Sequence, residues 1–176
     1  MSFTLSQSAL PVFETGLNAL SAVLGKAASF AEAKKIEEAI LLNTRLAPDM
    51  FNLCRQVQIA TDMAKNGSAR AAGHEAPRRD DTETTFAQLQ ERIADTISYL
   101  KTLEAAAINA SPDARMTFPL GRANKGEMAK DAYVTHFVLP NFYFHVTTAY
   151  AILRHCGVEI GKMDFLGNIP MQRTPV

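Results

Sequence analysis

The chain has 176 residues, which suits a single domain, and its 47% apolar and 20% charged residues are typical of a folded globular protein. Eighteen basic side chains balance eighteen acidic ones, and this zero net charge argues against binding to nucleic acid or to an anionic membrane. No apolar run reaches the roughly 18 residues of a membrane span, and the N-terminus lacks the features of a signal peptide. The two cysteines, Cys54 and Cys156, have no metal-binding spacing, which favours reduced thiols in a cytoplasmic protein.

Apolar residues recur every three or four positions in four segments, which is the spacing of amphipathic helices. The first segment runs from Leu5 to Ala27, and Pro11 predicts either a start just before it or a kink. After a short helical turn, Pro48 suits the first turn of the second helix, which is expected to fray into a loop over residues 66–81. The charged side chains of this loop are expected to be solvated: Arg70, Arg78, Arg79, Asp80 and Asp81.

The third helix is predicted to begin at Asp80, which has capping-box spacing with Glu83. Residues 109–130 break the helical pattern, and "MTFPLG" followed by "RANKGE" predicts a small hairpin or an ordered loop. The fourth helix is predicted between Leu139 and Gly157, followed by an irregular tail. Four amphipathic helices with a long third connection predict an all-α four-helix bundle whose last connection holds the hairpin.

The fourth helix is apolar nearly all round, which predicts that it is buried on most sides. Asn141, His145 and Thr148 form one polar stripe on it at three- and four-residue steps. Buried polar groups need hydrogen-bond partners, and Gln56 on the second helix is a candidate. Two interpretations stay open: a satisfied polar network inside the core, or a pocket between helices that binds a small polar molecule.

Three segments together resemble one known family: "LAPDMFNLCRQVQIATDMAK", "DTETTFAQLQERI" and "LPNFYFHVTTAYAILRHCGVEIGKMDFLG". They are similar to an uncharacterised bacterial domain-of-unknown-function family grouped with the DinB/YfiT-like four-helix bundles, a superfamily that includes metalloenzymes. The resemblance extends from about Ser6 to Gly167. It implies one DinB-like helical domain over residues 1–167 and leaves residues 168–176 as an irregular C-terminal tail.

The resemblance also implies where a metal would bind. Metal-binding members of the superfamily carry one histidine on the second helix and an HxxxH pair on the fourth. His145 matches the second histidine of that pair, whereas Asn141 stands at the first and Gln56 near the second-helix histidine. Only one of the three positions is therefore a histidine, so we expect no metal and no other cofactor; if a divalent metal does bind, His145 is its expected ligand.

These observations predict a small-molecule-binding protein with a polar pocket formed by His145, Asn141, Gln56 and Thr148. The resemblance to often dimeric relatives and the apolar excess of the fourth helix, with Tyr143, predict a homodimer. The alternative that the resemblance implies is a metal-dependent enzyme acting on a small molecule, either a transferase of low-molecular-weight thiols or a hydrolase. The identity of the ligand does not follow from the sequence.

Overall fold

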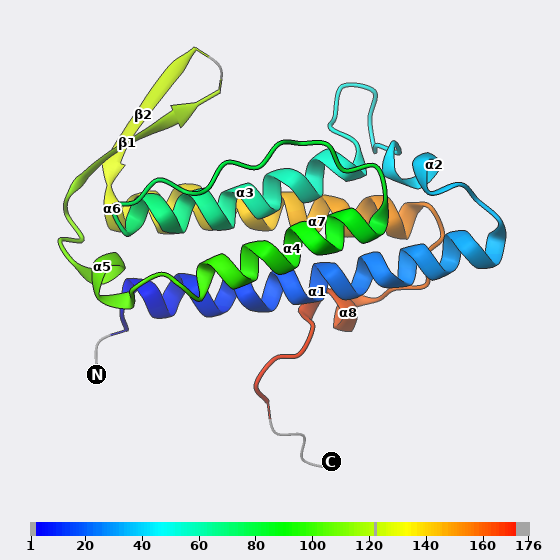
Figure 1. Cartoon of the computed structure of the whole chain (residues 1–176), viewed down its shortest axis with the longest axis horizontal. Coiled ribbons are helices and arrows are strands. Elements are labelled where there is room, and N and C mark those ends of the chain that lie inside the picture. The colour runs from blue at the N-terminus through cyan, green and yellow to red at the C-terminus, as the bar shows by residue number, and fades with distance from the viewer. Residues whose placement is uncertain (1–2, 122, 172–176) are drawn as a thin grey trace.

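The computed structural model describes residues 3–121 and 123–171, and all structural statements refer to these ranges. Four long helices lie roughly side by side along the long axis of the molecule, and a two-stranded hairpin projects from one end (Figure 1). The elements in chain order are α1 (Leu5–Lys34), α2 (Glu38–Leu42), α3 (Leu53–Ala71), α4 (Phe86–Leu100), α5 (Ala105–Asn109), β1 (Arg115–Leu120), β2 (Asn124–Ala129), α6 (Lys130–Ala132), the π-helical turn η1 (Tyr133–Val138), α7 (Leu139–His155) and α8 (Lys162–Leu166). This arrangement confirms the predicted four-helix bundle.

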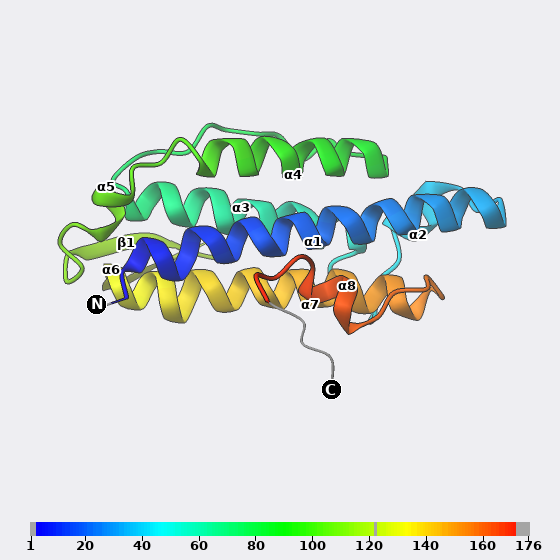
Figure 2. The same cartoon turned by 90° about the horizontal axis from the view of Figure 1, so that it is seen from below.

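The four long helices surround one apolar core. α3 packs against both α4 and α7, while α1 packs against α4 and α7 from the other side, and α8 lies on α1 (Figure 2). Each long helix contributes one buried stripe at three- and four-residue spacing, so the periodicity of the sequence is also the pattern of burial. The largest buried apolar side chains include Phe13, Leu17, Leu24, Leu53, Phe86, Leu89 and Phe142.

α1 begins where the apolar pattern begins and is longer than predicted at its C-terminal end. It begins at Leu5 because Thr4 and Gln7 form a capping box, and it continues through Pro11 as a single helix. A proline inside a helix removes one backbone hydrogen bond, but the buried stripe on either side of it outweighs this loss. The helix ends at Lys34 rather than near Ala27, because Ala31 is still buried in the core.

α3 begins later and ends later than predicted. Pro48 lies in the link before the helix, and the cap is Asn52, whose side chain accepts a hydrogen bond from the backbone N–H of Arg55 at 3.0 Å. At the other end the helix continues through Gly67 and ends at Ala71. Gly67 lies directly against Val138, and the absence of a side chain at this position allows α3 to approach η1 closely.

The predicted cap of the third helix is also wrong. α4 begins at Phe86, where Thr85 and Gln88 form the capping box instead of Asp80 and Glu83. Residues 72–85 form an irregular segment, which we call the strap, and it runs back along α3 to the start of α4 (Figure 1). Glu83 is therefore free to turn inward from the strap, where it is buried.

The structure contains the predicted hairpin and the predicted last helix, and it adds details that the sequence pattern does not show. β1 and β2 pair antiparallel, with Phe118 opposite Gly126, as the predicted hairpin requires. The last helix is preceded by the π-helical turn η1, and this wider turn leads into Pro140, whose ring would clash with the fourth preceding carbonyl in a regular α-helix. The tail was expected to be irregular, but it contains α8; residues 172–176 lie outside the described residues.

None of the helices among the described residues combines the length and the apolar character that crossing a membrane requires.

Candidate functional site

A histidine and a glutamine meet between α3 and α7. His145 lies in the second turn of α7 and Gln56 in the first turn of α3, and their Nδ1 and Oε1 atoms are 2.7 Å apart. The amide of Gln56 is oriented by its other end, because Nε2 donates a hydrogen bond to the carbonyl of Phe51 at 3.0 Å. Gln56 Oε1 therefore accepts from His145 Nδ1–H, which leaves His145 Nε2 with a free lone pair.

The imidazole of His145 is held in its neutral form. The side chain is only 8% exposed, and burial, assisted by the nearby guanidinium of Arg55, lowers the pKa of His145 to about 4. Among the described residues, Ser68 Oγ is the single buried side-chain nitrogen or oxygen without a hydrogen-bond partner. His145 Nε2 has no partner in that part of the chain either, so this atom retains some exposure to solvent.

One aromatic ring packs on His145, and a second belongs to the residue that orients Gln56. Phe144 packs edge-on against the His145 ring with centroids 5.1 Å apart, and its side chain is 57% exposed. Phe51, whose carbonyl orients Gln56, is 56% exposed, and the guanidinium of Arg55 lies 5.9 Å from the centre of its ring. An uncharged imidazole with an unpaired acceptor thus lies near exposed aromatic residues and one cation, which is the composition of many small-molecule sites.

The other two predicted site residues bond within their own helix. The Asn141 amide donates to the carbonyl of Phe137, and the Thr148 hydroxyl donates to the carbonyl of Phe144, each at 2.7 Å. Both lie on the same stripe as His145, one turn before it and one turn after it. The structure thus brings His145 and Gln56 into contact and leaves Asn141 and Thr148 beside them. None of the four lines the cavity that Arg55, Gln58, Asp81 and Glu83 help to enclose.

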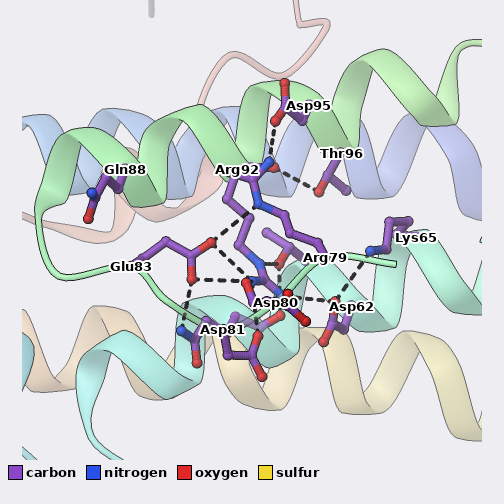
Figure 3. Close-up of polar contacts among 12 residues, drawn as sticks. Asp62, Lys65, Arg79, Asp80, Asp81, Glu83, Gln88, Arg92, Asp95 and Thr96 are labelled. Carbon is purple, nitrogen blue, oxygen red and sulfur yellow. Dashed lines mark hydrogen bonds and ion pairs between the residues drawn. The ribbon is translucent and has the colours of Figure 1, made fainter. Parts of the chain in front are cut away.

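The sequence analysis missed a second polar centre, the buried guanidinium of Arg92 (Figure 3). Arg92 lies on α4 between Leu89 and Thr96, on the face that packs against α3, and is 1% exposed. The signal in the sequence was its spacing, because it follows Leu89 by three residues on the apolar stripe of that helix. An arginine at such a position requires buried acceptors.

Acidic side chains from two elements supply those acceptors. Glu83 of the strap accepts from Arg92 NH1 at 3.1 and 3.2 Å, and Asp62 of α3 accepts from NH2 at 2.9 Å. Asp81 of the strap lies 2.9 Å from NH1, and the hydroxyl of Thr61 accepts from Nε at 2.7 Å. We call these five residues the Arg92 cluster, and together they fasten the strap to α3 and α4.

Burial and ion pairing act in opposite directions on the pKa values of the Arg92 cluster. Burial alone would raise the pKa of Glu83, but hydrogen bonds from Gln58 and Arg92 bring it below its usual value. Burial likewise raises the pKa of Asp62, and in this case the guanidinium of Arg92 offsets the shift only in part. The charged state of the cluster therefore depends on Arg92.

The prediction that the charged side chains of this segment are solvated is correct for only part of the strap. Arg78 is 92% exposed and pairs with the exposed Asp80. Arg79 is only 28% exposed at its side chain and forms ion pairs with Glu83 and Asp95. Mixed charge along a sequence does not distinguish these two cases, because the difference arises from the path of the strap over α3 and α4.

The donor set around His145 does not suit a metal ion. The predicted histidine positions carry the amides of Gln56 and Asn141, and Gln56 Oε1 is already bonded to His145 Nδ1. Zinc prefers histidine, cysteine and carboxylate ligands over amides. Within residues 3–121 and 123–171 there is no group of three or more such side chains placed to hold a metal. The residues around His145 therefore support no metal-dependent reaction.

The fold and this pair of helices define the class of protein, a DinB-like four-helix bundle. The chain matches the family described as "Domain of unknown function (DUF1993)" over residues 5–166, and it belongs to that family. It is also similar to a crystal structure at 1.83 Å described as a DinB family member protein from Shewanella denitrificans, with 43% sequence identity and a TM-score of 0.86. That match covers 97% of this chain and 96% of the other. No curated protein matches the chain.

Proposed function

We propose that this DUF1993 protein binds a small organic molecule at His145 without the help of a metal. One observation carries the proposal: a neutral imidazole with a fixed tautomer keeps its Nε2 without a hydrogen-bond partner among the described residues, next to the exposed ring of Phe144. Burying a polar side chain reduces stability unless the group is satisfied, and a histidine serving the core alone would have both ring nitrogens bonded. A ring nitrogen that the described residues leave unbonded supports a role in binding.

The chemistry of the site specifies its ligand in general terms. A neutral Nε2 accepts a hydrogen bond and does not donate one, so the ligand carries an O–H or N–H donor. The exposed ring of Phe144 packs on His145 and offers an apolar face, so the donor is attached to a flat or apolar body. We assign Asn141 and Thr148 to the ends of the same site, because they lie one helical turn from His145 on the same stripe.

The assembly and compartment belong to the same proposal. Exposed phenyl rings beside His145 are suited to burial against a second copy of the chain, so we propose that the protein acts as a homodimer. Cys54 and Cys156 are both free, which suits a reducing compartment, and we propose the cytoplasm.

A matched pair of probes tests the proposal. We expect 4-methylphenol, which has a donor, to shift the ring nitrogen resonances of His145 in nuclear magnetic resonance titrations. We expect 4-methylanisole, which has none, to bind about tenfold more weakly, because one hydrogen bond contributes about 1.4 kcal/mol. His145→Ala abolishes binding of the phenol. His136→Ala is the control, because His136 is exposed on η1.

Two results would contradict the proposal. Equal binding of the phenol and the anisole would show that Nε2 does not select for a donor. Unchanged binding of the phenol to His145→Ala would place any ligand elsewhere on the molecule.

A further inference from the structure

We propose that Arg55 determines the specificity of the His145 site by selecting ligands that carry a carboxylate or phosphate group, and that Asp81 of the strap is its positioning residue. This inference rests on the proposed function, because it concerns the ligand of that same site. It adds a negative charge to the donor and the apolar body that His145, Phe51 and Phe144 specify.

Arg55 has one side of its guanidinium occupied and the other free. NH1 donates to Gln58 Oε1 at 3.2 Å and also pairs with the carboxylate of Asp81. Nε and NH2 have no hydrogen-bond partner among the described residues, and the side chain is partly exposed. Nε and NH2 form the edge of arginine that binds two oxygens of one carboxylate or phosphate at once. The free edge therefore suits an anion.

Arg55 lies close to the residues that hold His145. Arg55 precedes Gln56 on α3, and its guanidinium lies 5.9 Å from the centre of the Phe51 ring. The carbonyl of Phe51 holds Gln56, which in turn holds His145. The positive charge of Arg55 is close enough to disfavour protonation of His145. Arg55, Phe51 and His145 are thus linked through Gln56 as a chain of neighbouring groups.

Asp81 connects Arg55 to the buried Arg92 cluster. Its carboxylate lies between two guanidiniums, that of Arg55 and that of the buried Arg92, 2.9 Å away. Arg92 is itself held by Glu83 and Asp62, so Asp81 is attached to a polar group that is buried and hydrogen-bonded (Figure 3). A long arginine side chain loses rotamer freedom when it binds, and holding NH1 in advance reduces that loss.

A narrower role for Arg55 would be to hold the strap through Asp81. That role needs NH1 alone, and the strap has further attachments that do not involve Arg55. Lys65 donates to the carbonyl of Pro77 at 2.9 Å, and Gln58 donates to Glu83 at 2.9 Å. The two roles are separated by ligand binding, because a strap anchor does not change the preference between a charged and an uncharged ligand.

The test compares 4-hydroxybenzoate with 4-hydroxybenzamide, which have the same ring and the same phenolic donor but differ in charge. We expect the wild-type protein to bind the benzoate at least tenfold more tightly at low salt, and this preference to decrease in about 500 mM salt because the charge is screened. Arg55→Gln loses the preference while it still binds the benzamide. Arg55→Lys keeps part of it, because the charge remains without the two-pronged edge.

Asp81 is tested by its own variants. Asp81→Asn leaves the charge of Arg55 in place but releases NH1, so we expect the preference for the benzoate to fall severalfold with binding of the benzamide unchanged. Asp81→Glu restores it in part. The control is Arg154→Gln, which removes an exposed charge near the end of α7 and leaves the preference as it was.

Each outcome decides between the proposals. Equal binding of benzoate and benzamide to the wild-type protein overturns selection for anions and leaves the His145 site intact. Binding of neither overturns the proposed function, and this inference with it. A preference that survives Arg55→Gln assigns the charge selection to another residue, and one that survives Asp81→Asn removes Asp81 from the site.

Discussion

His145 links stability to pH through its depressed pKa. Burial and Arg55 lower the pKa of His145 from 6.5 to about 4 in the folded protein, whereas the unfolded chain returns it to its ordinary value. Between these two values the unfolded chain binds more protons than the folded protein, so the free energy of unfolding rises with pH there. The stability is fully present above about pH 6.5 and is lost as the pH falls towards 4.

We predict that this one residue removes about 2–3 kcal/mol of stability between pH 7.5 and pH 4.5, since each pKa unit corresponds to 1.36 kcal/mol. Urea denaturation at both pH values measures the loss. His145→Gln serves as the control, because it keeps a polar side chain that does not titrate. An equal loss in the wild-type protein and in this variant would show that other groups cause the pH dependence.

Arg92 is the residue on which the charge cluster depends. Removing one member of a buried ion-pair group leaves its partners uncompensated, and Glu83 and Asp62 would both lose their main cation. We predict that Arg92→Met lowers the free energy of unfolding by about 3–5 kcal/mol in urea denaturation. Arg78→Met, at an exposed position of the strap, should change it by less than about 0.5 kcal/mol. A loss below about 1 kcal/mol for Arg92→Met would contradict this account.

The two polar centres differ in how far the sequence predicts them. The spacing of Asn141, His145 and Thr148 is visible in the sequence, and so is the match of His145 and Gln56 to positions that carry metal ligands in relatives. The partners of Arg92 are not visible in this way. Two of them come from the strap, and the path of an irregular segment has no periodicity that a sequence would display.

At the scale of elements, the helices are predictable from apolar spacing and their ends are not. Both Asp80 and Thr85 have a compatible residue three positions later, so local capping chemistry allows two starts for α4. Tertiary contacts decide between them, since Glu83 is drawn towards Arg92 and the backbone N–H of Phe86 donates to Glu38 at 2.8 Å. Helix ends are therefore set by partners distant in the sequence.

Gly67 determines how closely α3 approaches η1. A β-carbon at this position would lie 2.4 Å from Val138 Cγ1, much closer than such atoms pack. Alanine is favoured over glycine inside a helix by about 1 kcal/mol, but the buried contact leaves no room for it. We predict that Gly67→Ala destabilises the protein by about 1–3 kcal/mol in thermal or urea denaturation.

Two further variants check this explanation. Gly25→Ala in α1 should be neutral or stabilising by up to about 1 kcal/mol, because the added carbon meets only the flexible end of Gln90 at 3.4 Å. Adding Val138→Ala to Gly67→Ala should recover part of the lost stability by removing the clash. If Gly67→Ala is as stable as the wild-type protein, α3 and η1 are less closely packed than described.

At the scale of the whole molecule, one face of α7 is not covered by the other helices of the bundle. Tyr143 and Phe144 are exposed in the second turn of a helix that is buried on its other sides, and Phe51, whose carbonyl bonds to Gln56, is exposed as well. Neighbouring exposed aromatic side chains are uncommon on a monomer and are typical of interfaces and ligand sites. A second copy that covers this face would also shield His145 Nε2 from water, which strengthens a hydrogen bond from a ligand.

We therefore predict a homodimer that buries the Phe144 face of α7. Sedimentation velocity of the wild-type protein at about 50 µM should give the mass of a dimer, because stable interfaces of about 800 Å² per partner persist at such concentrations. Phe144→Glu should give a folded monomer, since it places a charge in the apolar centre of the interface. Met163→Glu, at a similarly exposed position on α8, should remain dimeric. A wild-type monomer would refute the prediction, and a dimer that persists in Phe144→Glu would move the interface to another face.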